Sequence, residues 1–171
     1  LGLNIKSSIA LSEIQMDLDF ESADKGMTVQ VNTSEFELAP TLKLIPENYL
    51  LALEGYELQG KSAIKFNYIS DRQKEAYIKV DFDLKEGYIK GKDLPFEMNE
   101  TSLMGSYSNG KQRTDASTEI KLDNIKFTAN SELVQANATI QGLKNPTLIT
   151  DFKTQMQLSE IESWGYKHDF K

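Results

Sequence analysis

Apolar and polar residues alternate along most of the chain, as in β-strands that have one covered and one solvated face. In 76–85 the even positions are all apolar, and the odd positions are Tyr, Lys or Asp. Similar runs occupy 64–68, 134–140 and 148–158. The pattern therefore predicts a mainly β protein with roughly ten strands.

Near 12–13, 33–34 and 123–124 the apolar residues change between odd-numbered and even-numbered positions, that is, they change parity. A slip of one residue would turn a whole strand over, so a β-bulge at each place is the expected explanation. Bulges bend and twist strands, and the turn residues between the runs indicate short connections. We therefore expect a long, bulged, mostly antiparallel curved sheet, shaped as an open groove or as a sandwich.

Two short helices are expected beside the strands. Pro in the first turn and Gly after the last turn predict a helix over 46–54. Ser159 and Glu162 form a capping-box pattern that predicts a second helix, which ends at Gly165. Each helix follows a strand pattern and precedes a Gly-Tyr pair, which indicates a weak internal repeat.

The length of 171 residues suits one domain. We expect a single β-rich segment, 1–171, with possible repeat units 1–60 and 61–171. The chain starts at Leu1, already in a strand pattern, and has neither a secretory signal nor an apolar run long enough to span a membrane. It is accordingly expected to be a segment of a larger protein.

Charge and composition narrow the chemistry. The 26 acidic and 19 basic residues give a net charge of −7, which disfavours nucleic acid as a partner. The chain has no cysteine and one histidine, His168, so it cannot form a disulfide, a thiolate site or a multi-histidine metal site. No glycine-rich phosphate loop is present. We expect no enzyme activity, no catalytic residue, no metal and no cofactor.

Several segments share a pattern with one known protein family. The segments are 42–46, 86–91, 94–96, 102–103, 105–111, 120–122, 142–146 and 151–152, followed by Met156, Leu158 and the helix from Ser159. Together they resemble the C-terminal region of AsmA-family proteins, which include TamB-like proteins. The resemblance implies a periplasmic β-structure of a Gram-negative bacterium, in a parent protein anchored in the inner membrane.

The same resemblance implies a function. The sheet of such proteins curls into an apolar groove that carries phospholipid between the inner and outer membranes, in support of outer-membrane assembly and homeostasis. In this chain the residues expected to face phospholipid acyl chains are Ile64, Phe66, Tyr68, Ile78, Val80, Phe82, Leu84, Val134, Ile140, Leu148, Phe152 and Met156. The alternative is a structural or adhesion β-sandwich, in which these residues close into a core and bind no lipid.

Overall fold

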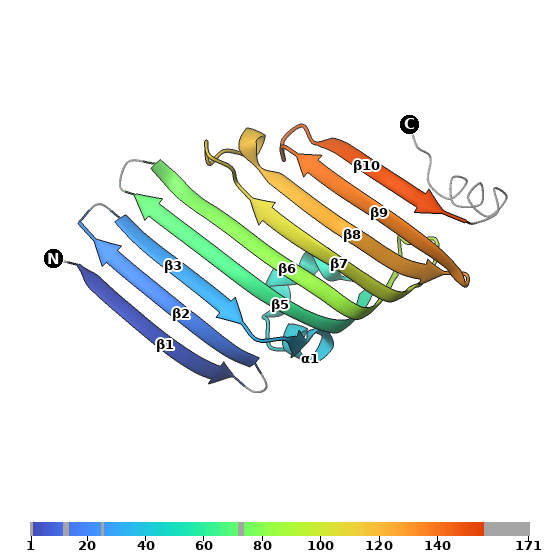
Figure 1. Cartoon of the computed structure of the whole chain (residues 1–171), viewed down its shortest axis with the longest axis horizontal. Helices are drawn as coiled ribbons and strands as arrows, with labels where there is room; N and C mark the ends of the chain where they lie inside the picture. Colours follow the sequence, from blue (N-terminus) through green and yellow to red (C-terminus); the bar gives the residue numbers. More distant parts are fainter. Residues whose placement is uncertain (1, 12–13, 25, 72–73, 156–171) are drawn as a thin grey trace.

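One antiparallel sheet of ten strands contains most of the residues that the structure describes (Figure 1). The computed structural model describes residues 2–11, 14–24, 26–71 and 74–155. The strands are β1 (Leu3–Leu11), β2 (Ile14–Ala23), β3 (Gly26–Thr33), β4 (Phe36–Glu37), β5 (Tyr56–Asp71), β6 (Lys74–Gly91), β7 (Met98–Ser108), β8 (Glu119–Ala129), β9 (Glu132–Gln141) and β10 (Thr147–Thr154). The helical elements are α1 (Leu38–Leu42) and the 3-10 turns η1 (Glu47–Tyr49), η2 (Leu51–Leu53) and η3 (Asp115–Ser117).

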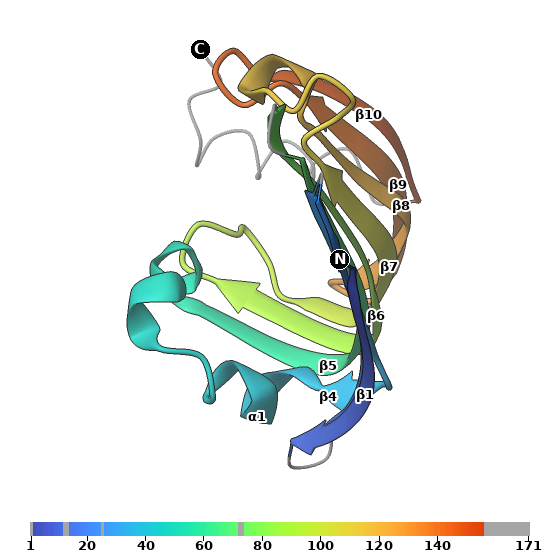
Figure 2. The same cartoon turned by 90° about the vertical axis from the view of Figure 1, so that its left-hand side faces the viewer.

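The strands follow one another across the sheet in the order of the chain. The order is β1-β2-β3-β5-β6-β7-β8-β9-β10, and the short β4 pairs with β5. The sheet is open, with β1 and β10 at its two edges, and it curves toward the side that carries α1 (Figure 2). The expected mainly β fold, with a curved antiparallel sheet, is confirmed.

The register of the strands separates two kinds of side chain. Residues directly opposite each other in an antiparallel pair point to the same face. One row of opposed residues crosses nine strands: Ser7, Leu18, Val31, Phe66, Val80, Tyr107, Ile120, Ile140 and Leu148. The next row, on the other face, is Ser8, Asp17, Asn32, Lys65, Asp81, Ser106, Lys121, Thr139 and Ile149. The sheet therefore has an apolar face and a polar face.

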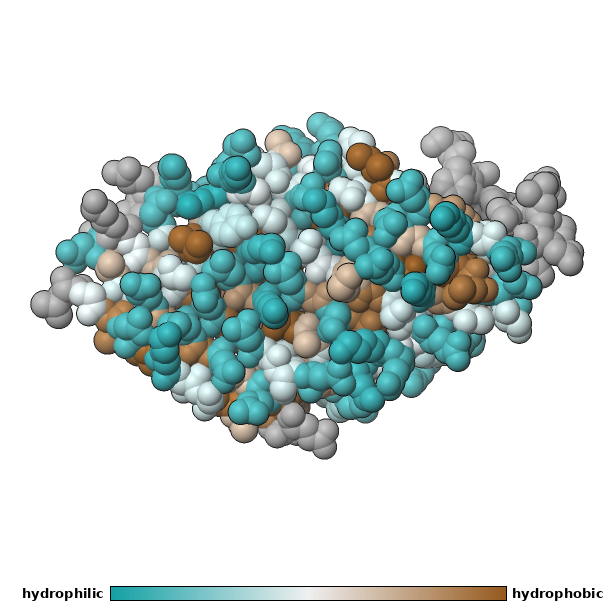
Figure 3. Space-filling model, viewed as in Figure 1, coloured by the Kyte–Doolittle hydropathy of each residue, from teal (hydrophilic) through white to brown (hydrophobic). Residues whose placement is uncertain are grey.

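The polar face is the convex one. Figures 1 and 3 view the sheet from the side opposite α1, and the surface seen there is mostly hydrophilic. Charged residues on this face pair with neighbours, for example Lys6 with Asp19 at 2.9 Å and Lys121 with Glu119 at 3.0 Å. The apolar rows face the concave side.

Bulges interrupt several strands of the curved sheet. Residues 33–35 face 63–64, so this strand has one residue more than β5. Register shifts also separate Leu84 from Gly87 in β6 and Leu122 from Ile125 in β8. The bulges expected near 33–34 and 123–124 are confirmed, and they supply the curvature.

The prediction of a bulge near 12–13 was wrong. Here β1 ends at Leu11 and β2 begins at Ile14, and these two residues pair with each other. The parity changes because the chain reverses direction between two antiparallel strands, whereas a bulge would continue one strand.

The helix predictions were also wrong in part. Residues 46–54 contain two 3-10 turns, since Leu50 between them has a φ of −101° and a ψ of 4°. Each turn is too short to gain the cooperative hydrogen bonding of an α-helix. The α-helix α1 begins earlier, at Leu38, and Pro40 within it disfavours a strand but is tolerated in the first turn of a helix. The helix expected from Ser159 lies outside the described residues.

The buried apolar core of the described residues is small. Phe127, Ala129 and Val134 form its main cluster, against which Phe96 and Met98 pack. The rings of Phe96 and Phe127 stack with centroids 5.7 Å apart. Since few side chains are fully buried, the strand-to-strand hydrogen bonds are essential to the fold.

Asn124 tests the importance of the bulges. Its φ of 54° is a conformation that β-branched residues adopt poorly, and its backbone N–H donates to Asn137 Oδ1 at 2.9 Å. We expect Asn124→Val to lower the free energy of unfolding by about 1–3 kcal/mol. Asn124→Gly, which accepts a positive φ, should change it by less than about 0.5 kcal/mol. Urea denaturation measures the free energy of unfolding of both variants. Equal losses of stability would contradict the positive φ at Asn124.

Candidate functional site

The concave face brings together every expected lipid-facing residue that the structure describes. Ile64 lies opposite Phe82, Tyr68 lies opposite Ile78, and Phe152 lies opposite Ala136. The residues on this face are Ile64, Phe66, Tyr68, Ile78, Val80, Phe82, Leu84, Val134, Ile140, Leu148 and Phe152. Met156 lies outside the described residues.

The same face contains residues outside the sequence-based prediction. They are Leu18, Phe20, Val29, Val31, Leu58, Ile89, Tyr107, Ile120 and Leu122. Their alternation marks most of them as strand residues, but parity alone does not tell which face of a bulged strand joins the next one. The pairing register supplies this information.

The concave face is only partly covered. Phe66, Val80 and Phe82 in the middle of the sheet are half-buried, whereas Leu148 and Phe152 near the edge are 64% and 49% exposed. All strands of the described residues belong to the same sheet, so no second sheet covers this face within those ranges. Of the two expected shapes, the described strands form the groove-like one.

Glycine allows aromatic rings to lie flat along the face. A Cβ on Gly105 would clash with the ring of Phe82, and a Cβ on Gly91 would clash with the ring of Tyr56. Each aromatic residue lies on the strand next to its glycine and covers it, a pairing that fills the space left by the absent side chain. The result is a continuous apolar floor, which consists of the residues of the concave face given above.

Charge is concentrated away from this floor. The Lys61 ammonium lies 2.8 Å from the Glu86 carboxylate, and their hydrogen bond raises the pKa of Lys61 and lowers the pKa of Glu86. A hydrogen bond from Lys90, at 2.7 Å, lowers the pKa of Glu97. The pairing register places both Lys61 and Lys90 on the convex face of the sheet, Lys90 after the register shift that reverses the alternation in β6. The concave rows that contain Val80, Phe82 and Ile78 include no charged residue.

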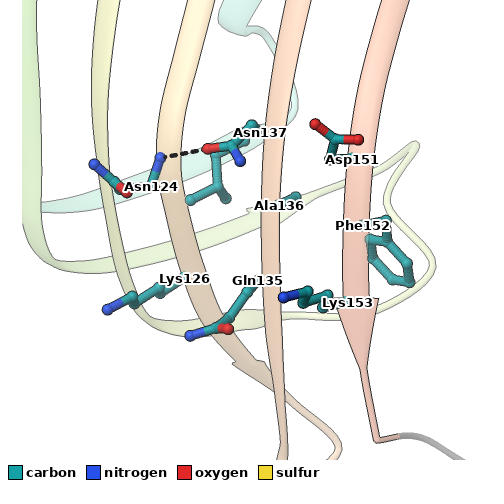
Figure 4. Close-up of a pocket in the computed structure, with 9 residues that line it drawn as sticks. Asn124, Lys126, Gln135, Ala136, Asn137, Asp151, Phe152 and Lys153 are labelled. Carbon is teal, nitrogen blue, oxygen red and sulfur yellow. Dashed lines mark hydrogen bonds between the residues drawn. The ribbon is translucent and has the colours of Figure 1, made fainter.

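A depression of about 500 Å³ lies on the polar side of β8, β9 and β10 (Figure 4). Lys126, Gln135 and Lys153 line it in one row, and Asp151 lines it as well. Asn137, also in its wall, already accepts the hydrogen bond that holds the bulge in β8. This depression contains no arrangement of a nucleophile with a base.

Neither a cluster of metal-binding side chains nor a membrane-spanning helix is found within the described ranges. These residues include no group of three or more His, Cys, Asp or Glu that could hold a metal ion. None of their helices is both long enough and apolar enough to cross a bilayer.

The geometry defines an open, curved antiparallel sheet with an apolar concave face. No protein-family model, curated protein or solved structure matches the chain. The chemistry of the concave face is therefore the main evidence on its function.

Gly105 tests how tightly the floor is packed. Gly105→Ala should lower the free energy of unfolding by about 1–3 kcal/mol, because the new methyl group must displace the Phe82 ring. In a Phe82→Leu background the same change should cost less, so the two substitutions should not be additive. Chemical denaturation of the two single variants and the double variant measures the coupling; strict additivity would show that the ring does not cover Gly105.

Acid should weaken the ion pairs of the convex face. The pKa values of Glu86 and Glu97 lie below their ordinary 4.5, so the stability from their pairs is complete above that value and is lost as the pH falls through the folded-state pKa. Melting temperatures from about pH 6 down to about pH 3 should fall less steeply for the Glu86→Gln, Glu97→Gln double variant than for the unmodified protein. If the melting temperatures of the two proteins fell equally steeply with pH, these ion pairs would not contribute to stability.

Proposed function

We propose that this chain is a non-enzymatic part of a cell-envelope protein whose concave face holds phospholipid acyl chains as they move between the inner and outer membranes. The observation that carries the proposal is the uncharged row that includes Phe66 and Val80, which crosses nine strands and has no second sheet over it within the described residues. In this role the protein would support outer-membrane assembly and homeostasis.

The dimensions of the face suit this ligand. Eight strand spacings of about 4.8 Å make the row about 38 Å long along the curve of the sheet. An acyl chain spans half of a hydrocarbon core of about 30 Å, or about 15 Å. The row is therefore long enough for acyl chains to occupy it along or across the strands.

The chemistry of the face favours binding without a fixed position. Each methylene group removed from water contributes about 0.8 kcal/mol. A wall without charged groups makes no directional contact with an acyl chain, so the chain can slide while it stays out of water. Such a surface suits transport better than storage of one specific ligand.

The location of the protein is proposed from the sequence. The resemblance of 86–91, 105–111 and 142–146 to AsmA-family proteins supports a periplasmic location, in a parent protein anchored in the inner membrane of a Gram-negative bacterium. The acidic net charge of −7 is compatible with a surface that does not bind nucleic acid.

Two neighbouring residues of β10 provide a matched test. Leu148 and Ile149 are 64% and 54% exposed, and they point to the concave and convex faces, respectively. Leu148→Glu should reduce the uptake of a dansyl-labelled phospholipid from phosphatidylethanolamine and phosphatidylglycerol vesicles by about ten-fold or more, because it places a charge in the acyl path. Ile149→Glu should leave the uptake unchanged.

Circular dichroism serves as the folding control for both variants, and Val80→Glu and Phe152→Glu extend the test to other strands. Equal uptake by the Leu148 and Ile149 variants would contradict the proposal. Failure of the unmodified protein to take up phospholipid would favour the alternative, a structural or adhesion module.

A further inference from the structure

The connection between β4 and β5 forms a hood, residues 38–55, beside the first part of β5. Residues 56–59 of β5 pair with β6 on one side, whereas β4 reaches only to the pair of Glu37 with Lys61 on the other. The hood, which contains α1, η1 and η2, follows β4 on the concave side of the sheet (Figure 2). It occupies the region where a neighbouring strand is missing.

Both ends of the hood are attached to the sheet. At its start, Phe36 is buried and pairs with Ser62, and the Thr41 hydroxyl donates to the Glu37 carbonyl at 2.6 Å. At its end, the Lys92 N–H donates to the Gly55 carbonyl at 3.1 Å. These attachments hold the hood at a defined position on the sheet.

A cavity of about 650 Å³ that opens widely to solvent is lined by residues of the hood and of β5. Its volume is within the range of about 300–1,000 Å³ typical of small-molecule sites. The apolar residues that line it are Leu42, Ile45, Leu50, Leu51, Leu53 and Leu58. Leu51 is 68% exposed, so the cavity has an apolar wall that reaches the solvent.

The cavity adjoins the concave face. Leu58 lines the cavity and lies opposite Ile89, and the ring of Tyr56, another lining residue, covers Gly91. The apolar floor therefore continues past the bend in β5 and β6 into the cavity.

The charges around the cavity indicate which part of a lipid enters it. Lys43, Glu47 and Glu54 line it and sum to a charge of 1 − 2 = −1. This charge disfavours a phosphate or carboxylate headgroup, whereas an uncharged hydrocarbon chain experiences no such repulsion. Leucine side chains supply the apolar surface that hydrocarbon requires.

We propose that the cavity under the hood binds the methyl end of one acyl chain of a phospholipid. This inference rests on the proposed function, because it assigns an end point to a lipid that lies on the concave face. The hood then holds the chain at one end of the face, while the remainder of the lipid stays on the open floor.

Photocrosslinking of the complete chain tests this inference. The probe is phosphatidylcholine with a diazirine at the methyl end of one acyl chain, presented in phosphatidylcholine vesicles and mapped by peptide mass spectrometry. We expect crosslinks in 42–54, and Leu51→Asp should reduce them by about ten-fold or more because it puts a charge at the cavity wall. Leu143→Asp, at an exposed residue of the β9–β10 connection, should leave them unchanged.

The position of the crosslinks separates the two proposals. Crosslinks on the concave strands without crosslinks in the hood would overturn the acyl site and leave the proposed function intact. The absence of crosslinks on both would overturn both proposals. Equal labelling of the hood in the Leu51 variant and in the unmodified protein, with both shown to be folded by circular dichroism, would also overturn the acyl site.

Discussion

Backbone hydrogen bonds between neighbouring strands hold this sheet together, and their register decides which side chains share a face. The row from Ser7 to Leu148 remains in step across nine strands, and the polar row beside it does the same. A shift of one residue in any strand would place its apolar side chains among the charges of the convex face. The curvature of the sheet, its apolar floor and the candidate site on its concave face all depend on this register.

The bulges reconcile this register with a bent sheet. An inserted residue bends its strand but also reverses the parity of the residues after it, and the partner strand must pair accordingly. In β8 and β9 this happens between Leu122 and Ile125, where both residues keep the concave face because they lie opposite Ala138 and Ala136. The Asn137 side chain holds the backbone of Asn124 at this point. Bending is therefore achieved without mixing the two faces.

Within the described residues the strands form a single curved sheet, and no second sheet lies over its apolar face. Side chains such as Phe66 and Val80 are half-buried by their neighbours in the sheet, and the cluster of buried residues around Phe127 is small. Contiguous exposed apolar surface in a protein commonly marks a binding site. The proposed lipid path and the hood at one end of it both depend on this single property.

The fold class could be predicted from the sequence alone, because alternation with period two is a local property of strands. The sequence also indicated the bulges at 33–34 and 123–124 and identified residues, such as Phe82 and Phe152, that share the concave face. It failed at 12–13 and 46–54, where a hairpin produces the same parity change as a bulge and where helix-capping signals surround a stretch that forms only 3-10 turns. The cavity under the hood was missed because its leucines come from a connection without periodicity. Within the described residues, the absence of a second sheet over the apolar face and the position of the hood beside β5 could be learned only from the three-dimensional structure, since both depend on contacts between segments far apart in the chain.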